Sequence, residues 1–466
     1  MPPNATKQAM QDSLKAMPSV IPSDSLFSRE RRALSIGTVG LCSMIAFEAI
    51  GVAAGMPAVA AALDGVSLYA LAFAGTLAGS LVAMVWSGRD CDQHGPMRSM
   101  VGGMLLFAAG LLLAGLAGSM PMLVVGRIVQ GLGVGALGVA LYVAVAHTLP
   151  GALHPKLFAL FSTAWVIPAV IGPVISGWVV DHLGWRWLFL GIAVLLVPTA
   201  ALILPPLRGA GAPDATAPRS WRVLPWALLA SVCCIALTVS ASAGRWTVPV
   251  VVVSLSAIGL AAKTLLPAGT LTLARGLPAV IALRALNSAA FFLCEAFVPL
   301  WLHQQRGWSI TAAGLALTGG ALSWSLGSHL QSRIIDDAAR QSWLARGCLF
   351  LASGIAACGV TVIGFLPDWT MLGAWTLVGL GMGLSFPMLG VLTLKLAPRQ
   401  QQGTYSSALQ LGAALCTSAA LATGGLLFSI LIAAMPTAAF ASVFALAALF
   451  AATAWISVAR VTTVAS

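Results

Sequence analysis

The sequence predicts an all-helical integral membrane protein with fourteen transmembrane helices. Of its 466 residues, 59% are hydrophobic and only 8% are charged, and the mean hydropathy is +0.95. These values exclude a soluble globular protein and a disordered chain. Apolar stretches of about 20 residues, the length that crosses a bilayer as a helix, recur from Ala33 to Val458. The short polar segments between them leave little chain for a soluble domain.

Residues 1–32 form a polar segment without a continuous apolar core, which excludes a signal peptide there. Arg29, Arg31 and Arg32 directly precede the first apolar stretch. Basic residues beside a span favour the cytoplasmic side, so this tail is expected to stay in the cytoplasm. The first six spans are expected at 33–62, 68–88, 97–118, 121–148, 156–180 and 185–206.

A charged linker rich in proline and glycine, from Arg208 to Arg222, follows the sixth span. Two further spans are expected at 223–242 and 246–266, and the last six at 278–303, 309–334, 343–365, 369–396, 404–431 and 436–458. The chain is thereby divided into a cytoplasmic tail (1–32), a six-helix bundle (33–206), a linker with an inserted transmembrane hairpin (207–277), a second six-helix bundle (278–458) and a cytoplasmic tail (459–466).

The distribution of basic residues supports this count. With both termini inside, Arg186, Arg245 and Arg306 are placed outside and Arg127 within the membrane, which leaves 20 of the 24 lysines and arginines on the cytoplasmic side. The count would be twelve only if the two segments between residues 223 and 266 did not cross the membrane. Because the basic residues are spread over many loops, they orient the protein and do not form a nucleic-acid surface.

The chain also repeats itself. The segment Gly131–Gly135 recurs as Gly379–Gly383, a shift of 248 residues, and Glu48 recurs as Glu295, a shift of 247. This repeat predicts two related six-helix halves with the hairpin inserted between them.

Three motifs in the first half together resemble a known family. Residues 127–133 match the RxxQGxG signature in the fourth helix of major facilitator superfamily transporters, and 185–189 are similar to the WRWxF that opens the sixth helix of drug exporters. Residues 172–177 resemble the GPxxGG signature of antiporters at Gly172, Pro173 and Gly177. The inserted hairpin is similar to the fourteen-helix drug:proton antiporter branch. The resemblance implies the major facilitator fold, with the substrate site between the halves near the membrane midplane.

Of the thirteen acidic residues, only Glu48 and Glu295 lie well inside expected spans. Burial disfavours the charged form of a carboxyl group, so such a residue can hold a proton and release it when water or a cation arrives. We expect Glu48, Glu295 or both to couple proton entry to substrate exit; the alternative is a neutral acid that packs helices. Arg127 either holds a carboxylate and relays the proton or pins two helices together.

The loop expected after the second span resembles the superfamily's loop signature at Gly88, Asp92, Gly95 and Arg98. The resemblance implies that Asp92 holds a cytoplasmic gate shut against a helix N-terminus, where the helix dipole favours a negative charge. Asp90 stands where leucine is usual in the family.

Aromatic and polar residues of the expected core helices suggest a substrate cavity. Such a cavity accepts amphipathic or cationic molecules through stacking and cation–π contacts, although aromatic residues in membrane helices also pack or face lipid. The few basic residues within spans disfavour a multivalent anion exchanger. The expected lining residues are Phe47, Tyr142, Trp165, Phe291, Phe292, Phe386 and Gln410.

Other functional classes lack their signals. There is no nucleophile elbow, HExxH motif or phosphate loop, so an enzyme is not expected, and the eight cysteines show no ligand spacing, so neither a metal nor a cofactor is expected. We therefore expect a multi-pass transporter of the cytoplasmic membrane that works as a monomer. It would export small lipophilic or cationic compounds in exchange for protons by alternating access, as in multidrug efflux. The alternatives are a metabolite or lipid exporter and an uncoupled facilitator.

Overall fold

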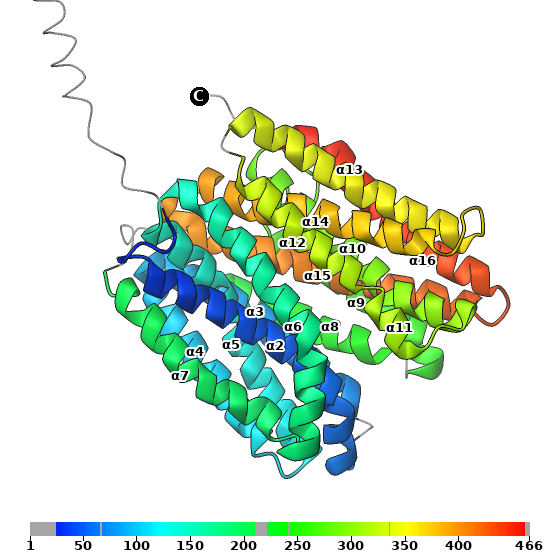
Figure 1. The fold of residues 1–466 in the computed structure, drawn as a ribbon, viewed down its shortest axis with the longest axis horizontal. Coiled ribbons are helices and arrows are strands. Elements are labelled where there is room, and N and C mark those ends of the chain that lie inside the picture. The colour runs from blue at the N-terminus through cyan, green and yellow to red at the C-terminus, as the bar shows by residue number, and fades with distance from the viewer. Residues whose placement is uncertain (1–24, 66–67, 210–220, 241–242, 335, 462–466) are drawn as a thin grey trace, which may run out of the picture.

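The computed structural model of the protein describes residues 25–65, 68–209, 221–240, 243–334 and 336–461 (Figure 1), and the regular structure of these residues is helical throughout. Most of the N-terminal tail (1–24), the middle of the linker (210–220) and residues 462–466 lie outside the described residues. The helices are α2 (Arg32–Ala62), α3 (Tyr69–His94), α4 (Pro96–Gly115), α5 (Met120–Thr148), α6 (His154–His182), α7 (Trp187–Leu207), α8 (Leu224–Val239), α9 (Thr247–Leu265), α10 (Leu277–Arg306), α11 (Ile310–Leu315), α12 (Thr318–Ser332), α13 (Asp337–Val362), α14 (Thr370–Leu396), α15 (Gln402–Leu431) and α16 (Pro436–Ser457).

These helices confirm the predicted fold class. Among the described residues, twelve helices are long and apolar enough to cross a membrane. The short helix α8, with 16 residues, and the pair α11 and α12 fill the two remaining positions, so that the count is fourteen. Figure 1 shows α2 to α7 in one bundle and α10 to α16 in another. The residues at which the bundles begin and end stay predictions.

Two predicted elements differ from the structure. The span expected at 309–334 is divided into α11 and α12, because Leu317 donates its N–H to the carbonyl of Gly314 in a tight three-residue turn. The prediction of a loop from Gly88 to Arg98 is wrong, because helix α3 continues to His94 and α4 begins at Pro96. Gly95 alone separates them, with a φ of 76° that glycine adopts without strain.

The repeat is visible in the packing of glycines. On α5, Gly131 and Gly135 lie against the backbone of α3 at Thr76 and Ser80, and Gly133 lies against α4 at Phe107. Their mates on α14 make the corresponding contacts: Gly379 and Gly383 with Gly320 and Trp324 of α12, and Gly381 with Leu351 of α13. The contacted residues are shifted by 244 in every case (320 less 76, 324 less 80, 351 less 107). The two halves are therefore built on the same close helix approaches.

The inserted hairpin touches both halves. Helix α8 packs on α3 and on α15, and α9 packs on α8 and α15. The hydroxyl of Ser231 on α8 donates a hydrogen bond of 2.9 Å to the carbonyl of Ala78 on α3. The hairpin thus lies along the α3 and α15 side of the groove between the halves.

We expect Gly131→Ala to lower stability by about 1–3 kcal/mol, because the new methyl group would overlap the backbone carbonyl of Thr76, which cannot move away as a side chain could. The thermal unfolding midpoint of purified protein measures the effect. Gly373→Ala on α14 is the matched control, because no atom lies within 4 Å of a Cβ at that position. Equal midpoints for the two variants would contradict the close approach.

Candidate functional site

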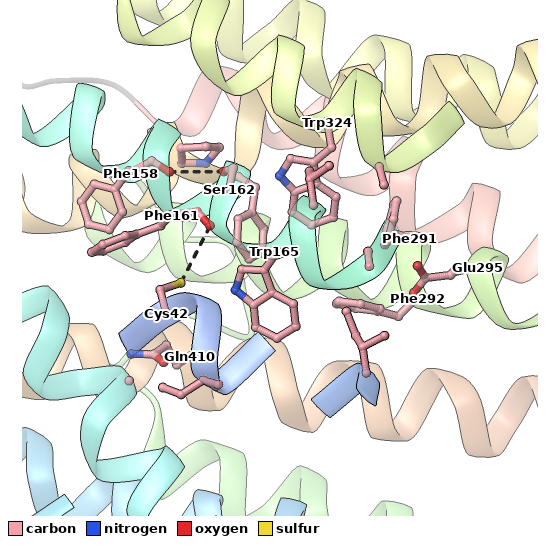
Figure 2. Close-up of a pocket in the computed structure, with 18 of the residues that line it drawn as sticks. Cys42, Phe158, Phe161, Ser162, Trp165, Phe291, Phe292, Glu295, Trp324 and Gln410 are labelled. Atoms are coloured by element: carbon pink, nitrogen blue, oxygen red, sulfur yellow. Dashed lines mark hydrogen bonds between the residues drawn. The ribbon is translucent and has the colours of Figure 1, made fainter. Parts of the chain in front are cut away.

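A cavity of about 690 Å³ lies between the two halves (Figure 2). Its wall comes from α2, α3, α5 and α6 on one side and from α10, α11, α12, α14 and α15 on the other. The predicted residues Tyr142, Trp165, Phe291, Phe292, Phe386 and Gln410 lie on this wall. Phe47 does not, because its ring packs between α2 and α6, within 3.8 Å of a Cβ built on Gly172. The role of these residues in substrate binding stays a prediction.

The half of the wall formed by α10 to α14 is a continuous aromatic cluster. The ring of Phe291 lies edge-on to Trp324, with centroids 5.0 Å apart, and Trp324 lies edge-on to Phe386 at 5.1 Å. Phe291 also contacts Trp375, with centroids 5.0 Å apart. Rings that hold one another in this way offer a preformed apolar surface for a flat or branched lipophilic molecule.

Glu295 of α10 lies on the same wall, beside Phe292 in Figure 2. Its side chain is half-buried, and among the described residues no hydrogen-bond donor or cation is paired with its carboxylate. The carboxyl group of Glu295 is therefore one of the polar groups that face the cavity. Its surroundings therefore change whenever the cavity opens, closes or fills.

Glu48, the repeat mate of Glu295, has the opposite setting. It is buried on α2, and its carboxylate accepts a short hydrogen bond from the guanidinium of Arg127 on α5. Arg127 also donates to the side-chain oxygen of Gln130 at 2.9 Å and to the carbonyl of Ala72 at 3.3 Å. Neither Glu48 nor Arg127 lies on the cavity wall. The structure thus joins two predicted residues into a closed, charge-balanced group inside the first half.

Trp375 explains why Glu295 is left without such a partner. It occupies the position that the 248-residue shift assigns to Arg127, and its indole N–H donates to the carbonyl of Leu317 at 3.3 Å. Arg127 makes a similar bond at the same distance to Ala72, whose position the 244-residue shift assigns to Ala316, the neighbour of Leu317. The second half therefore keeps the hydrogen bond between helices but lacks the cation.

Arg284 on α10 was missed as a membrane residue. The count of 20 cytoplasmic lysines and arginines includes Arg284, although the expected span 278–303 contains this residue. That placement is wrong. Arg284 lies seven residues beyond the start of α10 at Leu277, about 10 Å along the helix, and is only 4% exposed. Arg284 is one of the residues that line the cavity.

The predicted gate residue Asp92 joins the two halves. Its carboxylate accepts hydrogen bonds from the N–H of Gly403 at 2.6 Å and from the N–H and hydroxyl of Thr404 at 2.8 and 2.6 Å. These residues form the first turn of α15, so the charge lies at a helix N-terminus. Gly88, one turn earlier on α3, lets the helices approach, because a Cβ there would lie 2.8 Å from the Gly403 carbonyl.

Arg98 does not contact Asp92. Its Nε lies 3.7 Å from Asp90, which also accepts hydrogen bonds from Ser99 at 2.9 Å and contacts His94 at 3.0 Å. The residue that departs from the family pattern, Asp90, therefore ties α3 to α4 across the turn at Gly95. Asp92 is left to act between the halves.

A second contact joins the halves at the same end. The hydroxyl of Thr163 on α6 lies 3.0 Å from the hydroxyl of Ser325 and 2.9 Å from Nε2 of His329, both on α12. With the Asp92 contact, it holds the two halves together near the end where α3 finishes and α15 begins.

The predicted antiporter motif lies in the middle of α6. Pro173 is inside the helix, and Gly172 is buried against Phe47 and Ile50 of α2. Gly177 faces open space, whereas the preceding Ser176 is buried beside Gly51. Among the described residues, no group of three His, Cys, Asp or Glu side chains is placed to hold a metal ion.

We expect Asp92→Ala to open this end of the protein, because it removes three hydrogen bonds to α15. Cys91 is a natural reporter: it is fully buried on α3, and its side chain lies beside Gly403 of α15. Its labelling by a water-soluble maleimide should become about tenfold faster or more. Cys358 on α13, also fully buried but remote from α15's first turn, is the control and should stay unreactive. Unchanged labelling of Cys91 would refute the gate.

Comparison with known proteins agrees with this architecture. The family model of the Major Facilitator Superfamily matches residues 36–421. An uncharacterized MFS-type transporter of Mycobacterium tuberculosis (strain CDC 1551 / Oshkosh) is 25% identical over 396 residues, which are 80% of this chain and 56% of that relative. The chain thus spans little more than half of that relative's length.

A second protein of the same strain, called a probable multidrug-efflux transporter, is 27% identical over 358 residues, or 72% of this chain and 74% of that relative. Among solved structures, a bacterial homologue of the iron transporter ferroportin in an outward-facing state superposes with a TM-score of 0.70. It is 14% identical and covers 93% of this chain and 99% of its own, so the likeness is one of fold alone.

Proposed function

This chain belongs to the major facilitator superfamily of membrane transporters, and from that premise we propose that it exports small lipophilic compounds in exchange for protons. The cavity between the halves, at about 690 Å³, has the size of a drug-binding site. Its aromatic wall suits lipophilic molecules, and the similarity to a probable multidrug-efflux transporter supports export as the direction. Each chain holds a whole cavity, so the proposal needs no second copy.

The observation that carries proton coupling is Glu295 on the cavity wall without a cationic partner among the described residues. When the cavity opens to water on the acidic side, a carboxylate oxygen of Glu295 takes up a proton and the side chain becomes neutral. When the cavity opens to the other side, the proton leaves and the charge returns. Glu48, paired with Arg127 inside the first half, holds that half together and takes no part in the proton exchange of this proposal.

We assign the Asp92 end to the cytoplasm, because α2 begins at that end directly after Arg29 and Arg31. In this assignment the protein is closed to the cytoplasm, and the cavity opens toward the outside of the cytoplasmic membrane. This is the state in which substrate leaves and a proton enters. Rocking of the two halves about the cavity then exposes it to the cytoplasm.

The test is proton movement in proteoliposomes. Purified wild-type protein is reconstituted with a pH-sensitive dye inside, a pH gradient is imposed, and ethidium, pyrenebutanol and pyrenebutyrate are added in turn. We expect at least one of these lipophilic compounds to be transported together with a proton movement in the opposite direction. Protein-free liposomes measure the leak.

Transport of these compounds without any proton movement would refute the exchange and leave an uncoupled facilitator. Failure to move any of them, combined with transport of a polar metabolite or a labelled lipid, would replace drug efflux by export of a metabolite or of a lipid.

A further inference from the structure

Arg284 is a buried cation whose neighbours on the described chain are neutral. Its Nη1 donates to the carbonyl of Phe386 at 2.7 Å and its Nη2 to the hydroxyl of Tyr142 at 3.4 Å. The centre of the guanidinium lies 3.0 Å from the centroid of the Phe386 ring. Its Nε is buried and has no hydrogen-bond acceptor among the described residues.

The acids inside the membrane do not compensate this charge. Glu48 is paired with Arg127 in the first half. Glu295 lies eleven residues farther along α10, which separates the two positions by about 16 Å along the helix axis. Removal of a guanidinium from water without a counter-ion is costly, so a purely structural arginine is normally paired with an acid. The unpaired Arg284 faces the cavity, which leaves the ligand to supply the negative charge.

We propose that Arg284 binds the anionic end of an amphipathic organic substrate, of the class of aromatic carboxylates, while the aromatic wall holds its lipophilic end. The proposal rests on the cavity being the transport site, as proposed above. The planar guanidinium offers a fork of N–H groups that matches a carboxylate, and the Tyr142 hydroxyl lies beside it as a further donor. The Phe386 ring continues from Arg284 into the cluster with Trp324, so the polar and apolar subsites are contiguous.

The test compares three probes with one fluorescent body and different charges: pyrenebutyrate, the neutral pyrenebutanol and a pyrene-linked trimethylammonium. Binding to purified protein in detergent is measured by fluorescence titration. For the wild type we expect the carboxylate to bind about tenfold tighter or more than the alcohol, as a charge-assisted hydrogen bond allows. The ammonium should bind weakest of the three.

Arg284→Gln should reduce the preference for the carboxylate to about twofold or less, because the neutral side chain lacks the charge of the guanidinium. Arg284→Lys should keep part of the preference, since it keeps a charge without the fork. Arg275→Gln is the matched control: it makes the same change at an exposed arginine just before α10 and should behave as the wild type. Binding of pyrenebutanol shows that each variant is folded and its cavity intact.

Three outcomes overturn the proposal: equal or tighter binding of the alcohol or the ammonium by the wild type, an undiminished preference in Arg284→Gln, or equal competition from chloride or phosphate alone, which would make the site one for small inorganic anions. These outcomes are separate from the proton assay. Proton-coupled transport of ethidium with no carboxylate binding would support the exchange of substrate for protons and refute the role of Arg284 in binding an anion. Arg284-dependent carboxylate binding without proton movement would do the reverse.

Discussion

Proteoliposomes that carry Glu295→Gln are expected to release no protons when a transported compound is added, with a signal at the level of protein-free liposomes. Glutamine has the shape of glutamate but does not ionise at any accessible pH. Glu295 is the acid on the cavity wall, and its carboxylate has no cationic partner among the described residues. Substitution therefore removes the proposed proton carrier while it leaves the aromatic wall intact.

Two further variants complete this test. Glu295→Asp keeps a carboxyl group and should retain part of the proton signal. Glu48→Gln is the comparison at the repeat mate, and it should retain proton coupling in whatever fraction of the protein folds, because Glu48 does not lie on the cavity wall. The reverse pattern, with coupling lost in Glu48→Gln and kept in Glu295→Gln, would assign the proton to the first half.

Arg127→Gln is expected to destabilise the protein by about 3–5 kcal/mol, because it leaves Glu48 buried without its counter-ion. The expected measurement is a large fall in the yield of monodisperse protein and in its thermal unfolding midpoint in detergent. Gln130 is not charged and cannot replace the guanidinium, although its side-chain oxygen already accepts a hydrogen bond from it.

The double variant Glu48→Gln with Arg127→Gln shows whether the instability comes from an unpaired buried charge or from a general loss of packing. Neutral partners on both helices remove the unpaired charge, so the double variant should be more stable than either single variant. If Arg127→Gln alone has the unfolding midpoint of the wild type, the pair contributes nothing to the fold and a role in proton transfer becomes the remaining explanation for the arginine.

Much of this architecture was predictable, because hydropathy, loop charge and the internal repeat all report on helices one at a time. The pairing of Glu48 with Arg127 was not, because it depends on how α2 and α5 face each other. The repeat held a hint, however: the position of Arg127 is occupied by Trp375 in the second half, so the two glutamates could not have the same partner.

Arg284 was overlooked for a different reason. It stands near the beginning of a span, where arginines usually extend to the membrane surface, and only the packing of α10 against Phe386 shows that it turns inward. The direction in which Phe47 points could not be predicted either. A pattern of apolar residues does not distinguish the face of α2 toward the cavity from its face toward α6.

The contact of Asp92 with α15 has a consequence for how the molecules are distributed at rest. If two of its three hydrogen bonds, each worth about 1.4 kcal/mol, were lost without compensation, the form that is open at the Asp92 end would make up about 1% of the population. A transporter that turns over must visit that form often. Closure at the opposite end must therefore supply a similar free energy. Ligand binding then needs to change only the small free-energy difference that remains between the two forms.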